Sequence, residues 1–184
     1  DGLARLLGPR EGPVACLPCP TPEDRLLPPR ETGPVMRTAF HLAGHVNKRA
    51  VPLMRAVAAA AREVPDLRLE IAGGGGAEAF ATLSEAAARI APGRARLLGP
   101  RPHGEMPALF NESAACPMPS RRESYGMALA EALMAGCPVL WPRGAAIDGY
   151  FEDGSVGLAV DASDDAALAA GLARLARDEA AFKA

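Results

Sequence analysis

The stretch Ala114–Trp141, which reads AACPMPSRRESYGMALAEALMAGCPVLW, holds a complete strand–helix–strand unit. Its apolar ends, 114–118 and 138–141, have the length of short buried strands, and residues 125–135 form a run of small and apolar residues with the length of a helix. Two buried strands joined through a helix are typical of a parallel sheet, because parallel strands need a long crossover connection. This stretch therefore predicts an α/β fold.

The same alternation of strands and helices continues in both directions from this unit. Further strands are predicted at 35–43, 67–72, 95–98 and 156–160, and further helices at 50–64, 77–90, 105–110 and from Asp164 onward. This order predicts a doubly wound, Rossmann-like parallel sheet, in which ligands bind beyond the carboxyl ends of the strands. The loops expected at those ends are 44–49, 73–76, 99–103 and 119–125.

The chain divides into a short lead-in and one domain. Residues 1–34 contain eight prolines, which exclude a long helix and leave room for a short strand at Val14–Pro18. Residues 35–184 carry the strand and helix pattern and would form the Rossmann-like domain. Cys16 and Cys19 form a CxxC within the lead-in, but no helix follows them and no second CxxC completes a zinc site.

Composition excludes several functional classes. The 184 residues are 49% hydrophobic with a net charge of −2, which fits a globular domain and gives no basic excess for a nucleic-acid partner. No apolar run is long enough to span a membrane, and the amino-terminal residues do not follow a signal-peptide pattern. We therefore expect a cytoplasmic protein.

One acidic residue stands out in the helix of the opening stretch. Glu131 is the only charged residue between Gly126 and Trp141. A buried carboxylate without a partner costs several kcal/mol, so this side chain is expected either to reach solvent or to bind a ligand. Glu123, Met127 and Glu131 follow at four-residue steps, which on a helix gives one face about 12 Å long. Both carboxylates could then contact one elongated ligand.

The predicted start of this helix favours an anionic ligand. Gly126 and Met127 lie where unpaired backbone N–H groups and the positive end of the helix dipole attract a phosphate, and Arg121 and Arg122 add positive charge upstream. An anion whose hydroxyl groups are bound by carboxylates describes a nucleotide sugar. The alternative is an ordinary solvent-exposed glutamate on an amphipathic helix.

Three other loops carry candidate ligand groups. His45, Lys48 and Arg49 lie in the first strand-to-helix loop, where a lysine or arginine can bind a diphosphate, although a solvated basic helix start is the alternative. Gly74 belongs to a run of four glycines that could approach a sugar or phosphate closely or form a plain turn. Arg101 follows the next strand, in a loop that could border a base or simply be rigid.

Two further groups of residues are expected to be structural. Asp161, Asp164 and Asp165 could be metal ligands, but Ser163 followed by acidic residues is typical of a helix cap, so no metal site is predicted. Cys116 and Cys137 fall in two predicted buried strands and are expected to be inert thiols that lie close together if the strands are neighbours.

Taken together, these motifs resemble the carboxyl-terminal domain of the retaining, family-four glycosyltransferases of the GT-B fold. The similarity covers about Val35 to Phe182. Its anchor is the E-x7-E pattern of Glu123 and Glu131 within ESYGMALAEALMAGCPVL. Supporting segments are PDLRLEIAGGG, RARLLGPRPHGEMPALF and DGSVGLAVDASDDAALAAGLARLARD.

The resemblance implies a role for each matching residue. Glu131 would bind the ribose hydroxyls of a UDP- or GDP-sugar, and Glu123 would face the sugar. The backbone of Tyr125, Gly126 and Met127 would lie near the diphosphate.

The same resemblance assigns the remaining roles. Lys48 would neutralise the diphosphate leaving group without a metal or other cofactor, and the loop at Arg101 would border the base. The family usually has an arginine where this chain has His45, so Arg49 would have to replace it or phosphate would be bound more weakly.

The resemblance also implies that part of the enzyme lies elsewhere. GT-B enzymes close two Rossmann-like domains around donor and acceptor, so this chain would be the donor-binding half of a hexosyltransferase-type enzyme. Residues 1–34 would be the remains of the interdomain linker, and an amino-terminal acceptor domain, with any lipid acceptor or peripheral membrane contact, would be missing. Alone, the chain would bind the nucleotide sugar without transferring the sugar.

Two alternatives stay open at this point. A GT-B relative such as a nucleotide-sugar epimerase or a sugar phosphorylase would keep the fold and change the reaction. A non-catalytic interaction module would keep the fold around a decayed site; His45 favours this reading, and the intact Glu123 and Glu131 oppose it.

Overall fold

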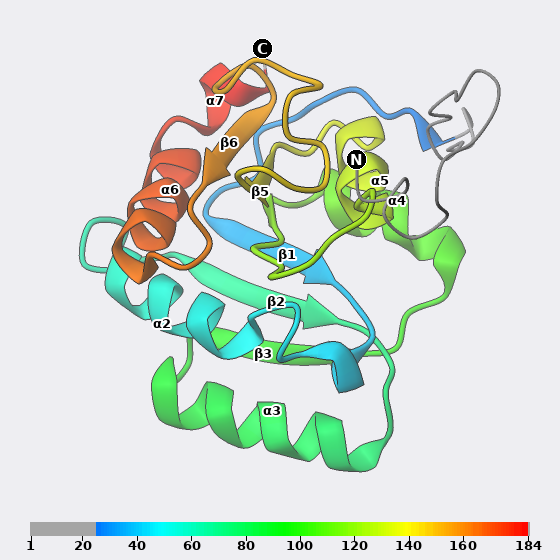
Figure 1. Cartoon of the computed structure of the whole chain (residues 1–184), viewed down its shortest axis with the longest axis vertical. Coiled ribbons are helices and arrows are strands. Elements are labelled where there is room, and N and C mark those ends of the chain that lie inside the picture. Colours follow the sequence, from blue (N-terminus) through cyan, green and yellow to red (C-terminus); the bar gives the residue numbers. More distant parts are fainter. Residues whose placement is uncertain (1–24, 184) are drawn as a thin grey trace, which may run out of the picture.

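The strands of this protein form parallel sheets, as the computed structural model of the chain shows for the residues it describes, 25–183 (Figure 1). One sheet has the order β1-β2-β3 and the other has the order β4-β5-β6. The strands are β1 (Val35–Ala39), β2 (Arg68–Ala72), β3 (Ala95–Gly99), β4 (Cys116–Pro117), β5 (Val139–Pro142) and β6 (Gly157–Val160).

Two backbone hydrogen bonds join the two sheets edge to edge. Ala114 N donates to Val35 O at 2.8 Å, and Arg37 N donates to Ala115 O at 3.1 Å, so the chain entering β4 pairs with β1. The combined spatial order is therefore β3-β2-β1-β4-β5-β6. This is the Rossmann-like arrangement predicted from the sequence. Successive strands are added toward one edge of the sheet from β1 to β3 and toward the other edge from β4 to β6, so the strand order reverses between β1 and β4.

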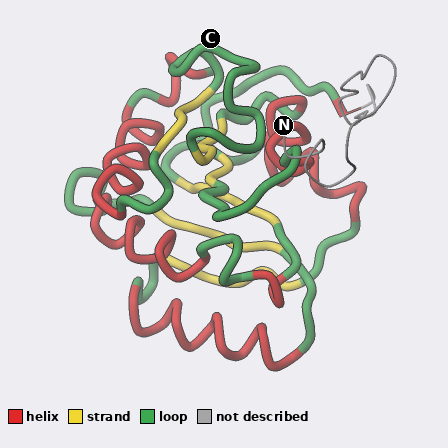
Figure 2. Tube along the Cα trace, in the orientation of Figure 1, coloured by secondary structure: helices red, strands yellow, loops and turns green. Residues whose placement is uncertain are grey.

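Helices pack in two groups. In one group α2 contacts α3 and α6, and in the other α4 contacts α5 (Figure 2). The buried apolar residues form two matching clusters, one built around α2, α3 and α6 and the other around α4 and α5. The helices are α2 (Ala50–Ala60), α3 (Ala77–Ile90), α4 (Met106–Asn111), α5 (Met127–Met134), α6 (Asp165–Arg177) and α7 (Glu179–Phe182), with 3-10 turns η2 (Leu42–Gly44) and η3 (His103–Glu105).

Two predicted boundaries matter for the site and were wrong. The first strand was predicted to reach residue 43, but β1 ends at Ala39 and the chain then turns through η2. The helix expected at 125–135 begins at Met127, because Gly126 precedes it in the left-handed conformation, with φ 85°. Glu123 therefore lies in the loop before α5, and it does not share a helix face with Glu131.

The glycine run 73–76 is fixed by close contact with the turn after β1. A Cβ atom on Gly73 would lie 1.9 Å from the carbonyl oxygen of Phe40, so only glycine fits there. Gly74 accepts a hydrogen bond from the backbone N–H of Leu42 at 2.7 Å. These contacts favour the turn, rather than ligand approach, as the reason for the glycines.

The described part of the lead-in, residues 25–34, packs against the domain. Leu27 N donates to Met134 O at 2.9 Å, and Asn111 donates to Pro28 O at 2.9 Å. Near its end, the backbone N–H groups of Thr32 and Gly33 both donate to Glu179 in α7. The strand predicted at Val14–Pro18 and the Cys16–Cys19 pair lie outside the described residues.

Within residues 25–183, no helix combines the length and the apolar character needed to cross a lipid bilayer.

Candidate functional site

A cavity of about 300 Å³ opens at the carboxyl ends of β1 and β4. These are the strands at which the sheet order reverses, the position where doubly wound folds bind ligands. Its lining comes from the turn after β1, from the loop after β4 and from the first residues of α5: Ala39, Phe40, His41, Lys48, Met118, Glu123, Ser124, Tyr125, Gly126, Met127 and Ala128. We call it the switch-point cavity.

Lys48 and Glu123 form an ion pair at this cavity. The Lys48 ammonium lies 2.5 Å from Oε2 of Glu123, and the two side chains are 22% and 13% exposed. Ser120 donates to the same oxygen at 3.4 Å, which leaves Oε1 of Glu123 without a hydrogen bond among the described residues. Because neither charge is fully buried, the pair can separate when an anion binds the ammonium and a hydroxyl binds the carboxylate.

Asn47 holds the two loops of this ion pair together. Its side-chain amide donates to Arg122 O at 3.0 Å and accepts from Arg122 N at 3.1 Å. The backbone carbonyl of Asn47 accepts a hydrogen bond from Arg121 N at 2.7 Å. Three hydrogen bonds therefore fix the loop after β4 to the loop after β1, and they place Lys48 opposite Glu123.

The amino end of α5 faces the cavity. Gly126 takes the cap position, and no side chain caps the helix. A Cβ atom on Gly126 would meet Leu129 at 3.0 Å and Ala146 at 3.3 Å, so the backbone there is closely packed as well as left-handed. The free N–H groups of this first turn, beside Tyr125, are suited to bind phosphate oxygens.

Glu131 lies one helical turn beyond the cavity and is 15% exposed. Its Oε1 accepts a hydrogen bond from Arg25 at 3.2 Å, and the ring Nε2 of His103 lies 3.7 Å from the same oxygen. The hydrogen bond from Arg25 and the nearby His103 ring are both at Oε1, so Oε2 remains available to bind a ligand hydroxyl. Glu131 thus extends the polar surface that begins at Lys48 and Glu123.

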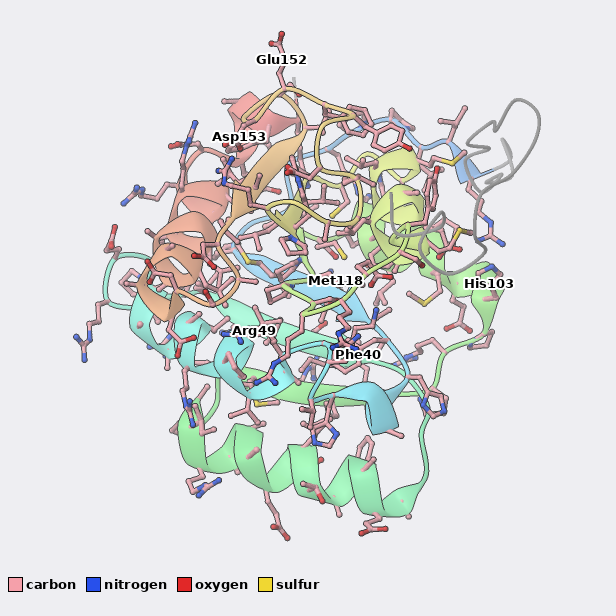
Figure 3. The ribbon with its side chains drawn as sticks, in the orientation of Figure 1. Phe40, Arg49, His103, Met118, Glu152 and Asp153 are labelled. Atoms are coloured by element: carbon pink, nitrogen blue, oxygen red, sulfur yellow. The ribbon has the colours of Figure 1, made fainter. Side chains whose placement is uncertain are left out.

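Four of the predicted site residues lie away from this cavity. The His45 ring makes a 3.0 Å hydrogen bond with Leu42 O, and Gly74 supports the same turn. Arg101 is exposed and approaches Glu105 at 3.9 Å. Arg49 points into a second pocket, and in the view of Figure 3 it lies on the opposite side of Met118 from His103. The structure therefore gives Arg49 no contact with the switch-point cavity.

Several polar groups of the site were not singled out from the sequence: Asn47, Arg25, His103, Ser120, Ser124 and His41, the last two of which line the cavity. Asn47 is adjacent to Lys48, and that adjacency was the available signal. Nothing in the sequence pattern indicates that Arg25 in the lead-in reaches Glu131, 106 positions away.

The remaining candidates are structural. Asp164 caps α6 by accepting from the backbone N–H groups of Ala166 and Ala167, which confirms a cap but at the residue after Ser163. Cys116 in β4 and Cys137, two residues before β5, are buried free thiols, so Cys137 does not lie in a strand as predicted. Burial raises the pKa of Cys116 to about 12 and raises the pKa of Cys137 well above its ordinary value, so both stay protonated and unreactive.

Known proteins resemble the part of the chain that contains the sheet and the candidate site. Residues 43–183 match the family model described as glycosyl transferases group 1. The D-inositol 3-phosphate glycosyltransferase of Corynebacterium urealyticum is 34% identical over 154 residues, which are 79% of this chain and 36% of that protein. The enzyme of the same name from Corynebacterium kroppenstedtii is 33% identical, over 82% of this chain and 35% of that protein. The chain thus spans about a third of the length of these relatives.

Solved structures show the same fold. Sucrose-phosphate synthase from Thermosynechococcus elongatus aligns with a TM-score of 0.81 over 99% of this chain and 48% of that chain, at 21% identity. A pneumococcal O-GlcNAc transferase, solved in complex with UDP and GlcNAc, aligns with a TM-score of 0.70 over 86% of this chain and 33% of that chain, at 24% identity.

Proposed function

Because the chain belongs to the family of group 1 glycosyl transferases, we propose that it is the donor-binding half of a retaining glycosyltransferase that uses a UDP-sugar. The observation that carries this proposal is the placement of Lys48, Glu123 and the uncapped start of α5 around one cavity where the sheet order reverses. Such a cavity offers positive charge and free N–H groups for a diphosphate and a carboxylate for the sugar.

The proposed roles follow the geometry. The Lys48 ammonium and the first N–H groups of α5 bind the diphosphate, and Glu123 accepts hydrogen bonds from sugar hydroxyls once Lys48 turns to the phosphate. Glu131 binds ribose hydroxyls through Oε2, one helical turn further along α5. Lysine supplies the charge that a metal would otherwise provide, so donor binding is proposed to need no metal or cofactor.

In the reaction proposed for the whole protein, the bond between the sugar C1 and the diphosphate oxygen breaks and a new C1–O bond forms to an acceptor hydroxyl on the same face. The acceptor proton moves to the departing phosphate oxygen, and UDP leaves. Since relatives are named for D-inositol 3-phosphate, the proposed acceptor class is a phosphorylated polyol. The acceptor would be bound largely by the part of the protein outside this chain. We also propose that the protein is cytoplasmic, as its sequence predicts.

Calorimetric titration tests the donor site. UDP should bind the wild-type chain in the presence of EDTA, and Glu131→Ala should weaken binding about 10- to 150-fold, since a hydrogen bond to a charged group contributes about 1.5 to 3 kcal/mol. The matched control is Glu85→Ala, which removes an exposed glutamate of α3 and should leave the affinity unchanged. Equal affinities of Glu131→Ala and wild type would remove Glu131 from the site.

The same titration with GDP and ADP tests the base. UDP should bind most tightly. Stronger binding of GDP would keep the donor site and overturn the choice of uridine. Transfer of a sugar to an added polyol phosphate by this chain alone would contradict the proposed division of the enzyme.

A further inference from the structure

A second pocket, of about 490 Å³, lies beside the switch-point cavity and contains three arginines. Its lining comes from the end of the loop before α2, the loop after β4 and the segments that follow β5 and β6: Arg49, Ser120, Arg121, Pro142, Arg143, Ala145, Asp161, Ala162 and Ser163. We call it the arginine pocket. The roles proposed for donor binding use none of its residues, so its charge needs a separate explanation.

Arg49 is held in an unusual way at this pocket. Its backbone has a φ of 53°, in the left-handed region, which costs of order 1 kcal/mol for a residue other than glycine. Its side chain is 11% exposed, and one guanidinium nitrogen pairs with Asp165 at 3.2 Å. Its Nε is buried and has no hydrogen-bond partner among residues 25–183. A native protein rarely leaves a buried charged donor unpaired.

The other two arginines add positive charge at the rim. Arg143 donates to Ala159 O at 2.7 Å and lies 3.2 Å from Asp153. Arg121 is exposed and has no ion pair among the residues that the structure describes. The loop that contains it is fixed by Asn47, so its position is set without using the guanidinium group.

Three aspartates offset the formal charge of these arginines. Asp161 is the one carboxylate in the described lining, and it accepts hydrogen bonds from the backbone and the hydroxyl of Ser163 at 2.8 and 2.6 Å. Asp165 and Asp153 each neutralise one arginine from outside the lining. With Asp161, the three aspartates balance the three arginines in formal charge, so the capacity to bind an anion lies in the donors left unused, the Arg121 guanidinium and Nε of Arg49. Guanidinium groups bind phosphate oxygens in a bidentate manner.

We propose that the arginine pocket is a second anion site, which binds a phosphate monoester separately from the donor nucleotide. A dianionic phosphate would supply acceptors to Arg121, Arg143 and the unpaired Nε of Arg49. The volume exceeds that of a phosphate group, so the pocket admits a phosphate that is attached to a small polar body. Ser120 lies between the two sites, since it lines the arginine pocket and donates to Glu123.

Phosphate titration followed by ³¹P NMR, in the presence of saturating UDP, tests this site. Arg121→Gln and Arg143→Gln should each weaken the binding of inorganic phosphate about tenfold or more. The matched control is Arg122→Gln, which removes the same charge from the adjacent residue, outside the lining, and should change the affinity by less than about twofold. If the two test variants lose no more affinity than the control, the arginine pocket is not the site.

Competition distinguishes this proposal from the proposed function. UDP should not displace phosphate from the arginine pocket, and Lys48→Met should weaken UDP binding while it leaves phosphate binding intact. Displacement of phosphate by UDP in a one-to-one manner would place the anion in the donor cavity and overturn the second site. Absence of UDP binding with phosphate binding intact would overturn only the donor assignment.

A second arm identifies the source of the phosphate. Titration of myo-inositol 3-phosphate tests a phosphorylated acceptor, and this arm rests on the proposed function. Affinity at least about tenfold above that of inorganic phosphate, lost in Arg121→Gln, indicates an acceptor group; equal affinity indicates a site for free phosphate.

Discussion

Two lysine–glutamate pairs lie at opposite ends of the sheet and are built differently. At the amino ends of β1 and β4, Glu179 accepts from Lys183 and from Thr32 and Gly33, and all its contacts lie between 2.8 and 3.0 Å. At the carboxyl ends of the same strands, Glu123 accepts from Lys48 and weakly from Ser120. The first pair uses its full hydrogen-bonding capacity inside the protein, whereas the second retains capacity and borders a cavity.

The lysines differ in the same sense. Lys183 is 2% exposed and also donates to Arg30 O at 2.6 Å and Ser113 O at 2.8 Å, so its three N–H groups are occupied. Lys48 is 22% exposed, and its ammonium has polar partners only in the Glu123 carboxylate and the sulfur of Met118 among the described residues. Similar chemistry thus fixes α7 to the lead-in at one end, and at the other end it borders a cavity where we propose that it binds a ligand.

The largest expected effect comes from the same substitution made at both lysines. Lys183→Met leaves Glu179 buried without its cation and should lower the free energy of unfolding by about 3 to 5 kcal/mol. Lys48→Met leaves a partly exposed carboxylate and should cost about 1 kcal/mol or less. Urea unfolding of both variants measures the difference, and equal losses would contradict the assignment of one pair to structure and the other to binding.

The same two substitutions should affect UDP affinity in the reverse order, with the larger loss in Lys48→Met. Lys48→Met should weaken UDP binding about 10-fold or more, because it removes a charge-assisted contact to phosphate. Lys183→Met, measured at a temperature at which it remains folded, should bind UDP like the wild type. Calorimetry with both variants makes this comparison, and a weakened affinity only in Lys183→Met would invert it.

Acid should destabilise the structural end of the sheet. Burial alone would raise the pKa of Glu179, but the Lys183 ammonium and the Thr32 donors outweigh burial and hold the pKa below its ordinary value. Glu70 is likewise buried, and Arg37 and Arg96 hold its pKa low. A carboxyl group with a lowered pKa stabilises the fold above its unfolded pKa, and this contribution is lost as the pH falls.

We therefore expect the urea midpoint to decrease between roughly pH 5 and pH 3. Glu70→Gln should flatten part of this dependence, since the variant has no proton to gain at that position. Glu85→Gln, on the exposed face of α3, should retain the wild-type slope. A Glu70→Gln profile parallel to that of the wild type would remove Glu70 from the acid response.

Local patterns predicted the sheet well and the site only in part. The strand and helix periodicity of 114–141 was sufficient to predict the fold, because buried strands and crossover helices impose their spacing on the sequence. The helix face through Glu123 and Glu131 was a wrong prediction, since Gly126 begins the helix after Glu123.

Tertiary contacts explain why the sequence did not reveal the different environments of the basic side chains Lys48, Arg49 and Lys183. Lys48 and Arg49 are adjacent and looked equivalent, but the left-handed backbone at Arg49 turns them toward different pockets. The burial of Lys183 also has no local signal, because its partners Arg30 and Ser113 come from 153 and 70 positions away.

The smallest predicted effect concerns Arg25. It gives Glu131, near the switch-point cavity, a partner inside the protein, as Lys183 does for Glu179 at the other end of the sheet. The 3.2 Å contact from Arg25 occupies Oε1 of Glu131 and directs Oε2 outward. Arg25→Gln should therefore free the carboxylate to rotate and weaken UDP binding about two- to fivefold, which corresponds to a partly exposed ion pair of about 0.4 to 1 kcal/mol. Arg30→Gln, which breaks an exposed pair with Glu112 at 3.1 Å, is the control from the same segment. Tighter UDP binding in Arg25→Gln would show instead that Arg25 competes with the nucleotide for Glu131, in which case the lead-in would restrain the donor site rather than orient it.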